Sequence, residues 1–198
     1  IPISSDSDLP PAEKARRERM REVTGGITAY SVDANGSFAA FAVNGIPFIV
    51  DLSNNSVRAL PASGPVVDPR INPTGTAVAF VIDRSMYVTQ VTADATSCIA
   101  KVEHDHEAWG LADFVAAEEL ARYRGFWWLS EAEDLLLVER FDESNVVEWW
   151  IADPAQPGNE PQSRRYPATG TTNAVVELWL INSLGDRTQV TWDRENFP

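Results

Sequence analysis

Two stretches of the sequence decide the fold, Val32-DANGSFAAFAVNGIPFIVD-Leu52 and Ile71-NPTGTAVAFVIDRSMYVTQ-Val91. They align without gaps at a period of about 40 residues, which is typical of repeat architectures, and the alignment matches Gly36 with Gly75. Each copy contains a tight turn with Gly, a strand, a second turn and another strand, which is about the length of one four-stranded propeller blade. The repeat therefore predicts a mainly β chain built from propeller blades.

Weaker copies of the pattern follow the two clear ones. A third runs from Trp128 to Asp153, and a fourth begins at Thr171. The adjacent pairs Trp127-Trp128 and Trp149-Trp150 must point to opposite faces of their strands. Both faces of these strands are therefore expected to be buried, as in a blade between two neighbours. A β-sandwich is the competing architecture.

The expected organisation is an N-terminal arm at residues 1–26 followed by a partial β-propeller at residues 27–198. Helix-forming residues from Pro11 to Glu22 predict a helix in the arm, and their lack of an apolar stripe indicates a surface position. The expected boundaries are about 27–61, 66–102, 126–154 and 171–198 for four blades, with a helical insertion at about 103–125. Four blades cannot close a ring of seven or eight, so blade edges are expected to be exposed unless a second copy of the chain covers them.

The charge balance excludes several classes of partner. The chain holds 16 Lys and Arg residues against 29 Asp and Glu residues, a formal net charge of −13, which argues against binding to nucleic acid or to an anionic membrane surface. No apolar run approaches the roughly 20 residues of a membrane-spanning helix. The single cysteine, Cys98, rules out an internal disulfide and a four-thiolate zinc site, and it fits a reducing compartment.

Common catalytic and cofactor motifs are missing from the sequence. It contains no G-x-S-x-G, no G-x-x-x-x-G-K-[ST], no G-x-G-x-x-G and no H-E-x-x-H, so no cofactor is expected. His104 and His106 would place two rings on one face of a strand, as in some metal sites. Because no third ligand stands at a usual spacing, surface polarity is the better interpretation and no metal is expected.

Glu118 and Glu119 form the most informative charged pair. Asp113 can cap a short helix that contains them, in Ala116-AEELAR-Tyr123. Two adjacent carboxylates on a helix usually belong to a solvated face. The alternative is a site for a cation, because side chains at i and i+1 lie about 100° apart and both reach one ammonium group only at an exposed helix edge. Such a pair would bind a free α-amino group through charge-assisted hydrogen bonds and disfavour a blocked N-terminus.

The residues around this pair resemble a known family. The string Glu118-Glu119-Leu-Ala-Arg122-Tyr123-Arg-Gly125-Phe126-Trp127-Trp128 is similar to the E-E-x-x-R-[FY]-x-G-[FY]-W-W signature of the dipeptidyl peptidase IV family, in particular of its cytosolic branch of dipeptidyl peptidases 8 and 9. Further motifs agree in order and spacing: Arg17-ERMREVTGG-Ile27-Thr-Ala-Tyr30, Asp68-Pro-Arg70, Phe141-Asp-Glu-Ser144 and Tyr166-PATGTT-Asn173.

The resemblance implies a serine exopeptidase in which an eight-bladed β-propeller precedes an α/β-hydrolase domain. Such an enzyme removes N-terminal dipeptides whose second residue is Pro or Ala. Glu118 and Glu119 match the double glutamate that binds the substrate's free N-terminus, and Arg21 matches the arginine that contacts the substrate carbonyl. The family's Ser, Asp and His triad would lie C-terminal to Pro198, so this chain alone is expected to be inactive. The branch favours a cytoplasmic location, and the resemblance is compatible with a homodimer.

Two other classes of function stay open. A propeller can be a protein-binding module, in which the two glutamates are merely solvated. A glycosidase with paired carboxylates is the third hypothesis, although adjacent positions on one helix match poorly with acids on opposite sides of a scissile bond. A downstream hydrolase domain containing G-x-S-x-G would favour the peptidase.

Overall fold

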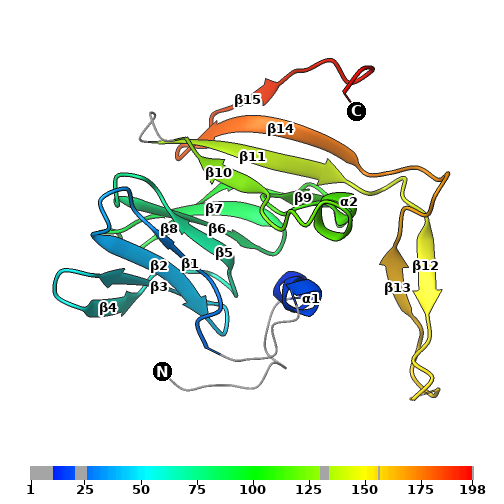
Figure 1. The fold of residues 1–198 in the computed structure, drawn as a ribbon, viewed down its shortest axis with the longest axis horizontal. Coiled ribbons are helices and arrows are strands. Elements are labelled where there is room, and N and C mark those ends of the chain that lie inside the picture. Colours follow the sequence, from blue (N-terminus) through cyan, green and yellow to red (C-terminus); the bar gives the residue numbers. More distant parts are fainter. Residues whose placement is uncertain (1–10, 21–25, 130–133, 156, 198) are drawn as a thin grey trace.

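The computed structural model of the chain describes residues 11–20, 26–129, 134–155 and 157–197. Three antiparallel sheets stack in this part of the chain, and a two-stranded hairpin extends from one end of the stack (Figure 1). The helices are α1 (Pro11–Met20) and α2 (Phe114–Glu118). The strands are β1 (Tyr30–Val32), β2 (Phe38–Val43), β3 (Ile46–Asp51), β4 (Ser56–Ala59), β5 (Val67–Ile71), β6 (Ala77–Ile82), β7 (Ser85–Gln90), β8 (Thr96–Ala100), β9 (Glu107–Trp109), β10 (Phe126–Trp128), β11 (Leu135–Asp142), β12 (Glu148–Ile151), β13 (Gln162–Arg165), β14 (Val175–Asn182) and β15 (Arg187–Val190).

The first two sheets have the same topology, β1-β2-β3-β4 and β5-β6-β7-β8. Matching turns start the repeat in each sheet. The Asp33 carboxylate accepts a hydrogen bond from the first amide of β2 at 2.6 Å, and the Asn72 side-chain carbonyl accepts one from the first amide of β6 at 3.0 Å. Gly36 and Gly75 follow with φ of +67° and +75°, a conformation that glycine adopts without a steric penalty. The two aligned stretches therefore fold alike.

The second sheet is buried on both faces, which explains the unbroken apolar run of β6. Every residue of β6 is buried. Val78 and Phe80 belong to a hydrophobic cluster shared with the first sheet, whereas Ala79 and Val81 belong to a cluster shared with the third. A sandwich of two sheets would leave one face of each sheet in water. The prediction of a mainly β, partial propeller is confirmed, and the β-sandwich alternative is excluded.

The third sheet corrects the expected boundary between a third blade at 126–154 and a fourth at 171–198. Its strands are ordered β10-β11-β14-β15, and β9 also pairs with β11. β11 and β14 pair along eight residues, from Leu135 opposite Asn182 to Asp142 opposite Val175. Both expected blades therefore contribute to one sheet. Alternation along a strand indicates which face is buried but not which strand is its neighbour, so the sequence pattern could not show that the two segments pair.

The two tryptophan pairs occupy different environments. Trp127 and Trp128 on β10 are partly buried, and Trp128 donates its indole N–H to the Arg70 carbonyl at 2.9 Å. Trp149 and Trp150 on β12 are 49% and 66% exposed. Their expected burial is wrong because β12 pairs with β13 alone, and an isolated hairpin has no second layer to cover its faces.

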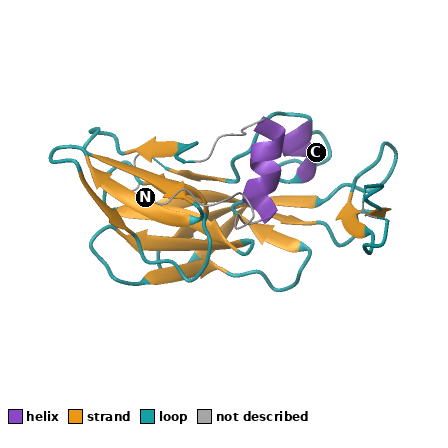
Figure 2. Cartoon of the chain, turned by 90° about the horizontal axis from the view of Figure 1, so that it is seen from below, coloured by secondary structure: helices purple, strands orange, loops and turns teal. Residues whose placement is uncertain are grey.

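The helix expected from Pro11 to Glu22 is present as α1, which is described as far as Met20. Arg17 donates to Glu13 at 2.9 Å, and both residues are buried although the helix has no apolar stripe. α1 is therefore covered on this polar face, in contrast to the expected surface position. Figures 1 and 2 show α1 and α2 near each other at the same end of the stack. Neither described helix has the length and apolar character needed to cross a membrane.

Candidate functional site

The candidate residues lie on an excursion between β9 and β10, at residues 110–125. Its two ends are joined through one residue of β11: Gly110 N–H donates to the Glu139 carbonyl at 2.8 Å, and Glu139 N–H donates to the Gly125 carbonyl at 2.7 Å. A Cβ at position 125 would lie 2.3 Å from the Leu111 carbonyl carbon. Only glycine allows the two ends to approach so closely, which gives the glycine of the signature string a structural role.

α2 presents the two glutamates at its C-terminal end. The Asp113 carboxylate caps the helix by accepting hydrogen bonds from Val115 N–H at 2.9 Å and Ala116 N–H at 3.3 Å. Glu118 is the last helical residue and Glu119 is the C-cap, and both side chains are exposed. The carbonyl groups of a helix end carry partial negative charge. This charge adds to that of the two carboxylates and favours a cation here.

The helix is shorter than the Ala116–Tyr123 segment that its propensity favours. Beyond Glu119 the chain reverses direction, because Ala121 takes a left-handed φ of +51° and Arg122 N–H donates to the Ala116 carbonyl at 2.9 Å. The Arg122 side chain bonds to Glu139 on β11. Tertiary contacts therefore end α2 immediately after the glutamate pair.

Arg122 ties the segment after the glutamates to the start of α2 and to the third sheet. Its guanidinium donates to Glu139 Oε2 at 2.5 Å and to the Arg124 carbonyl at 2.8 Å, and lies 3.4 Å from Asp113 Oδ2. The other oxygen of Glu139 accepts the Asp113 N–H at 2.9 Å. One buried carboxylate thus bonds to the residue that caps α2 and to a residue that follows it.

The buried position of Glu139 shifts its protonation equilibrium. Its side chain is 1% exposed. Burial raises its pKa from the usual 4.5 to about 7, although the hydrogen bond and charge of Arg122 act in the opposite direction. The protonated and the ionised forms of Glu139 are therefore both populated near neutral pH.

The remaining candidates lie apart from this network or outside the described residues. Arg21, the expected carbonyl contact, is in the 21–25 segment, which the structure does not describe. His104 Nε2 lies 3.4 Å from Asp142 Oδ2, while His106 faces the Arg165 guanidinium at 3.2–3.3 Å. A guanidinium beside an imidazole disfavours a metal cation, and within the described ranges no cluster of three or more His, Cys, Asp or Glu residues could hold one.

Sequence reasoning gave no role to two residues that support the site. Arg122 stands in the signature string, and Glu139 is a buried charged residue of β11, on the opposite face of the strand from Leu136 and Val138. An acid at such a position needs a cationic or hydrogen-bonding partner. Glu139 therefore indicates a buried pair, but only the structure identifies Arg122 as the partner.

Comparison with known proteins gives the chain a family. The fold is an incomplete propeller in which an excursion presents paired carboxylates. The family model described as the dipeptidyl peptidase IV N-terminal region matches residues 41–196. The chain belongs to this family.

Relatives agree with the assignment. Mouse dipeptidyl peptidase 8 is 30% identical over 200 aligned residues, which cover 88% of this chain and 22% of the relative. A probable dipeptidyl peptidase 4 of Aspergillus fumigatus is 31% identical over 155 residues, covering 74% and 20%. The crystal structure of Porphyromonas gingivalis dipeptidyl peptidase 4 matches the fold with a TM-score of 0.71 at 24% identity, covering 88% of this chain and 27% of that one. The chain thus spans about a fifth of the length of the curated relatives it matches.

Proposed function

We propose that this chain is the substrate-recognition portion of a serine dipeptidyl aminopeptidase that releases N-terminal Xaa-Pro or Xaa-Ala dipeptides. Glu118 and Glu119 bind the free N-terminus of the peptide, and Arg21 contacts its carbonyl. The observation that carries the proposal is the exposed carboxylate pair at the end of α2, held in place by Arg122 and Glu139. The family assignment supports it.

The geometry suits recognition of an amine by charge. An ammonium group offers three N–H donors, and two carboxylates side by side accept them as charge-assisted hydrogen bonds. An acetylated N-terminus has no charge and gives the two carboxylates no charge-assisted hydrogen bond, which disfavours it. Binding the amine at a fixed point also sets which peptide bond reaches the nucleophile, because positioning alone lowers the barrier substantially.

Hydrolysis of the peptide bond requires catalytic groups, which the relatives' family has in another domain. We propose that an α/β-hydrolase domain of the same protein provides the Ser, Asp and His triad, and that the 198-residue chain alone does not hydrolyse peptides. Turnover of an Xaa-Pro reporter by this chain, retained through further purification, would contradict the second statement.

The test compares a free and an N-acetylated Xaa-Pro reporter in the full-length protein. Loss of a desolvated charge partner costs about 2–5 kcal/mol, so Glu118→Gln/Glu119→Gln is expected to lower kcat/KM for the free reporter by roughly 30-fold to several thousand-fold. Glu160→Gln is the matched control, because Glu160 is an exposed glutamate outside the excursion. If the double variant cleaves as well as the wild type, the pair is a solvated helix end and the protein-binding module becomes the better proposal.

The hairpin supports a self-associated form of the protein. Trp149, Trp150 and Ile151 on β12 are 49%, 66% and 58% exposed, and exposed apolar groups of this size mark association surfaces. We therefore include a homodimer in the proposal. A cytoplasmic location is also proposed, because the single cysteine, Cys98, is free and exposed, which suits a reducing compartment.

A further inference from the structure

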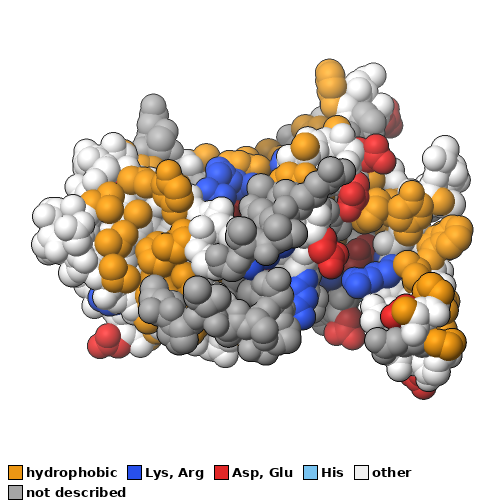
Figure 3. Space-filling model, turned by 60° about the horizontal axis from the view of Figure 1, so that its bottom comes forward, with side chains coloured by type: hydrophobic (Ala, Val, Ile, Leu, Met, Phe, Trp, Pro, Cys, Tyr) orange, Lys and Arg blue, Asp and Glu red, His pale blue; other side chains and the backbone are white. Residues whose placement is uncertain are grey.

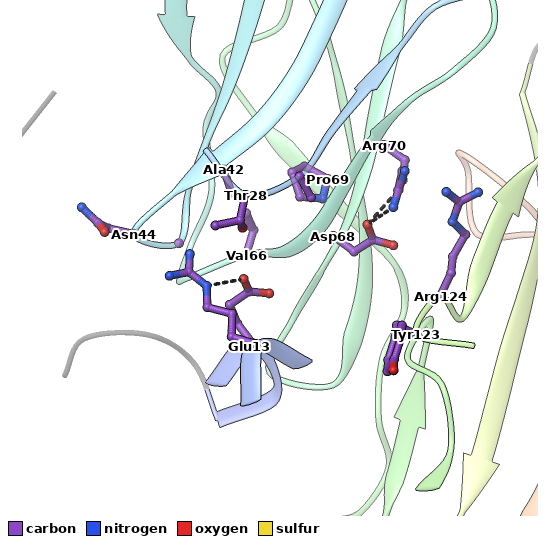
Figure 4. Close-up of a pocket in the computed structure, with 13 residues that line it drawn as sticks. Glu13, Thr28, Ala42, Asn44, Val66, Asp68, Pro69, Arg70, Tyr123 and Arg124 are labelled. Atoms are coloured by element: carbon purple, nitrogen blue, oxygen red, sulfur yellow. Dashed lines mark hydrogen bonds and ion pairs between the residues drawn. The ribbon is translucent and has the colours of Figure 1, made fainter. Parts of the chain in front are cut away.

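A polar cavity lies next to the excursion that carries the candidate site. It encloses about 260 Å³ between α1, the beginning of β5 and the segment that follows α2 (Figure 4). Tyr123 and Arg124 line it and stand only a few residues after Glu119 in the same excursion. The cavity is therefore built partly by the segment that carries the glutamate pair. Figure 3 shows acidic and basic side chains gathered in the middle of one face, between apolar surfaces at its two ends.

The charges that line this cavity differ from those of the chain as a whole. Among the described residues that line it, Arg17, Arg70 and Arg124 stand against Glu13 and Asp68, an excess of one cation in a chain with a formal net charge of −13. Glu13 pairs with Arg17 at 2.9 Å, and Asp68 pairs with Arg70 at 2.6 Å. The remaining cation is Arg124, whose side chain has no hydrogen bond or ion pair to the described residues. Burial and the charge of Arg70 lower the pKa of Arg124, and the charge of Asp68 acts in the opposite direction, so a second guanidinium and a carboxylate both lie near it.

Asp68 also lines the cavity, and Arg70 holds its side chain. Both nitrogens of Arg70 that contact it bind the same oxygen, Oδ1. Its other oxygen, Oδ2, is buried and accepts no hydrogen bond from the described part of the chain. A buried acceptor without a donor is costly. The Asp68 backbone has a φ of +50° where the register of β5 against β6 shifts, and such bulges redirect side chains.

We propose that this cavity is a peptide subsite that takes an acidic residue of the substrate, with the residue's carboxylate on Arg124. The cavity volume fits one or two residues, because pockets for larger ligands are typically 300 Å³ or more. The ring of Tyr123 provides a wall beside them. The inference rests on the proposed function, since the peptide that enters the cavity is the one whose N-terminus is bound at Glu118 and Glu119.

The test uses the full-length protein and matched pairs of peptides that begin Gly-Pro. The two peptides of a pair have Asp and Asn, respectively, at the same position. Separate pairs place this residue at positions three, four, five and six. At one position the Asp peptide is expected to have a KM at least about ten-fold lower than the Asn peptide, the value of one hydrogen bond to a charged group. Arg124→Gln abolishes this ratio and Arg124→Lys keeps part of it. Arg58→Gln, an exposed arginine of β4, keeps it in full.

The Asp-to-Asn ratio is measured within each protein, so a variant that folds incompletely loses active fraction without changing the ratio. No preference for Asp at any position, or a ratio that survives in Arg124→Gln, overturns the subsite. Failure of the proposed function looks different: no peptide is hydrolysed, and calorimetric titration of the same Asp and Asn peptides then measures the subsite. An affinity ratio that depends on Arg124 supports the subsite even in that case.

Discussion

Replacing Glu139 by Gln should change how the stability of the chain depends on pH. The folded-state pKa of Glu139 is raised to about 7 from 4.5, so between these values the folded chain binds a proton that the unfolded chain does not. The free energy of unfolding therefore falls as pH rises through this window. The difference of about 2.5 pKa units corresponds to roughly 3 kcal/mol in favour of the wild type at acidic pH. Gln cannot ionise, so Glu139→Gln removes this dependence.

The measurement is urea unfolding of the 198-residue chain followed by tryptophan fluorescence between pH 4.5 and pH 7.5. The wild type minus Glu139→Gln difference in unfolding free energy should decrease by roughly 3 kcal/mol across the window. Any constant effect of the substitution, including the changed contact with Arg122, cancels in this comparison. Parallel stability curves for the two proteins would refute the reasoning.

Glu107 gives a matched control, because it is also buried but its pKa is shifted in the opposite direction. Burial acts to raise the pKa of Glu107, yet hydrogen bonds from Glu103 N–H, Arg140 and Trp109 hold it below its usual value. A lowered folded-state pKa stabilises the chain above the unfolded value, and this stability is lost only as pH falls below it. Glu107→Gln should therefore keep the wild-type slope between pH 5.5 and pH 7.5.

Two further predictions concern the excursion and the hairpin. Gly125→Ala should lower the free energy of unfolding by at least about 2 kcal/mol, because the added Cβ would lie 2.3 Å from a backbone atom of Leu111. Thermal unfolding measures this loss. An unchanged Tm would show that the two ends of the excursion are not held together. Trp150→Ser should change the free energy of unfolding by no more than about 0.5 kcal/mol, because the side chain is 66% exposed. Sedimentation velocity should detect weaker self-association of this variant. A large loss of stability would mean instead that Trp150 packs within its own chain.

Several parts of the candidate site follow from local sequence. Asp113 was expected to cap a helix and does so through two backbone N–H groups. The placement of Glu118 and Glu119 on a short helix is also visible in the local pattern. The length of α2 is not, because propensity favours a helix as far as Tyr123 and the contact of Arg122 with Glu139 ends it earlier. These two residues are far apart in the sequence, and local propensity contains no information about such a pair.

The sequence by itself determined the repeat and the turns that start it, because the groups that make each turn are within five residues of one another, as in the hydrogen bond from Phe38 N–H to Asp33. It also shows which strands are apolar on both faces, although Trp149 and Trp150 on such a strand are exposed. Only the tertiary structure decided that β11 pairs with β14, that β12 and β13 leave the sheet, and that Arg70 and Arg124 come together in one cavity. Side-chain alternation along a strand indicates which face is buried, and turn residues indicate the local backbone geometry. Which distant strand becomes the neighbour depends instead on the packing of the whole chain.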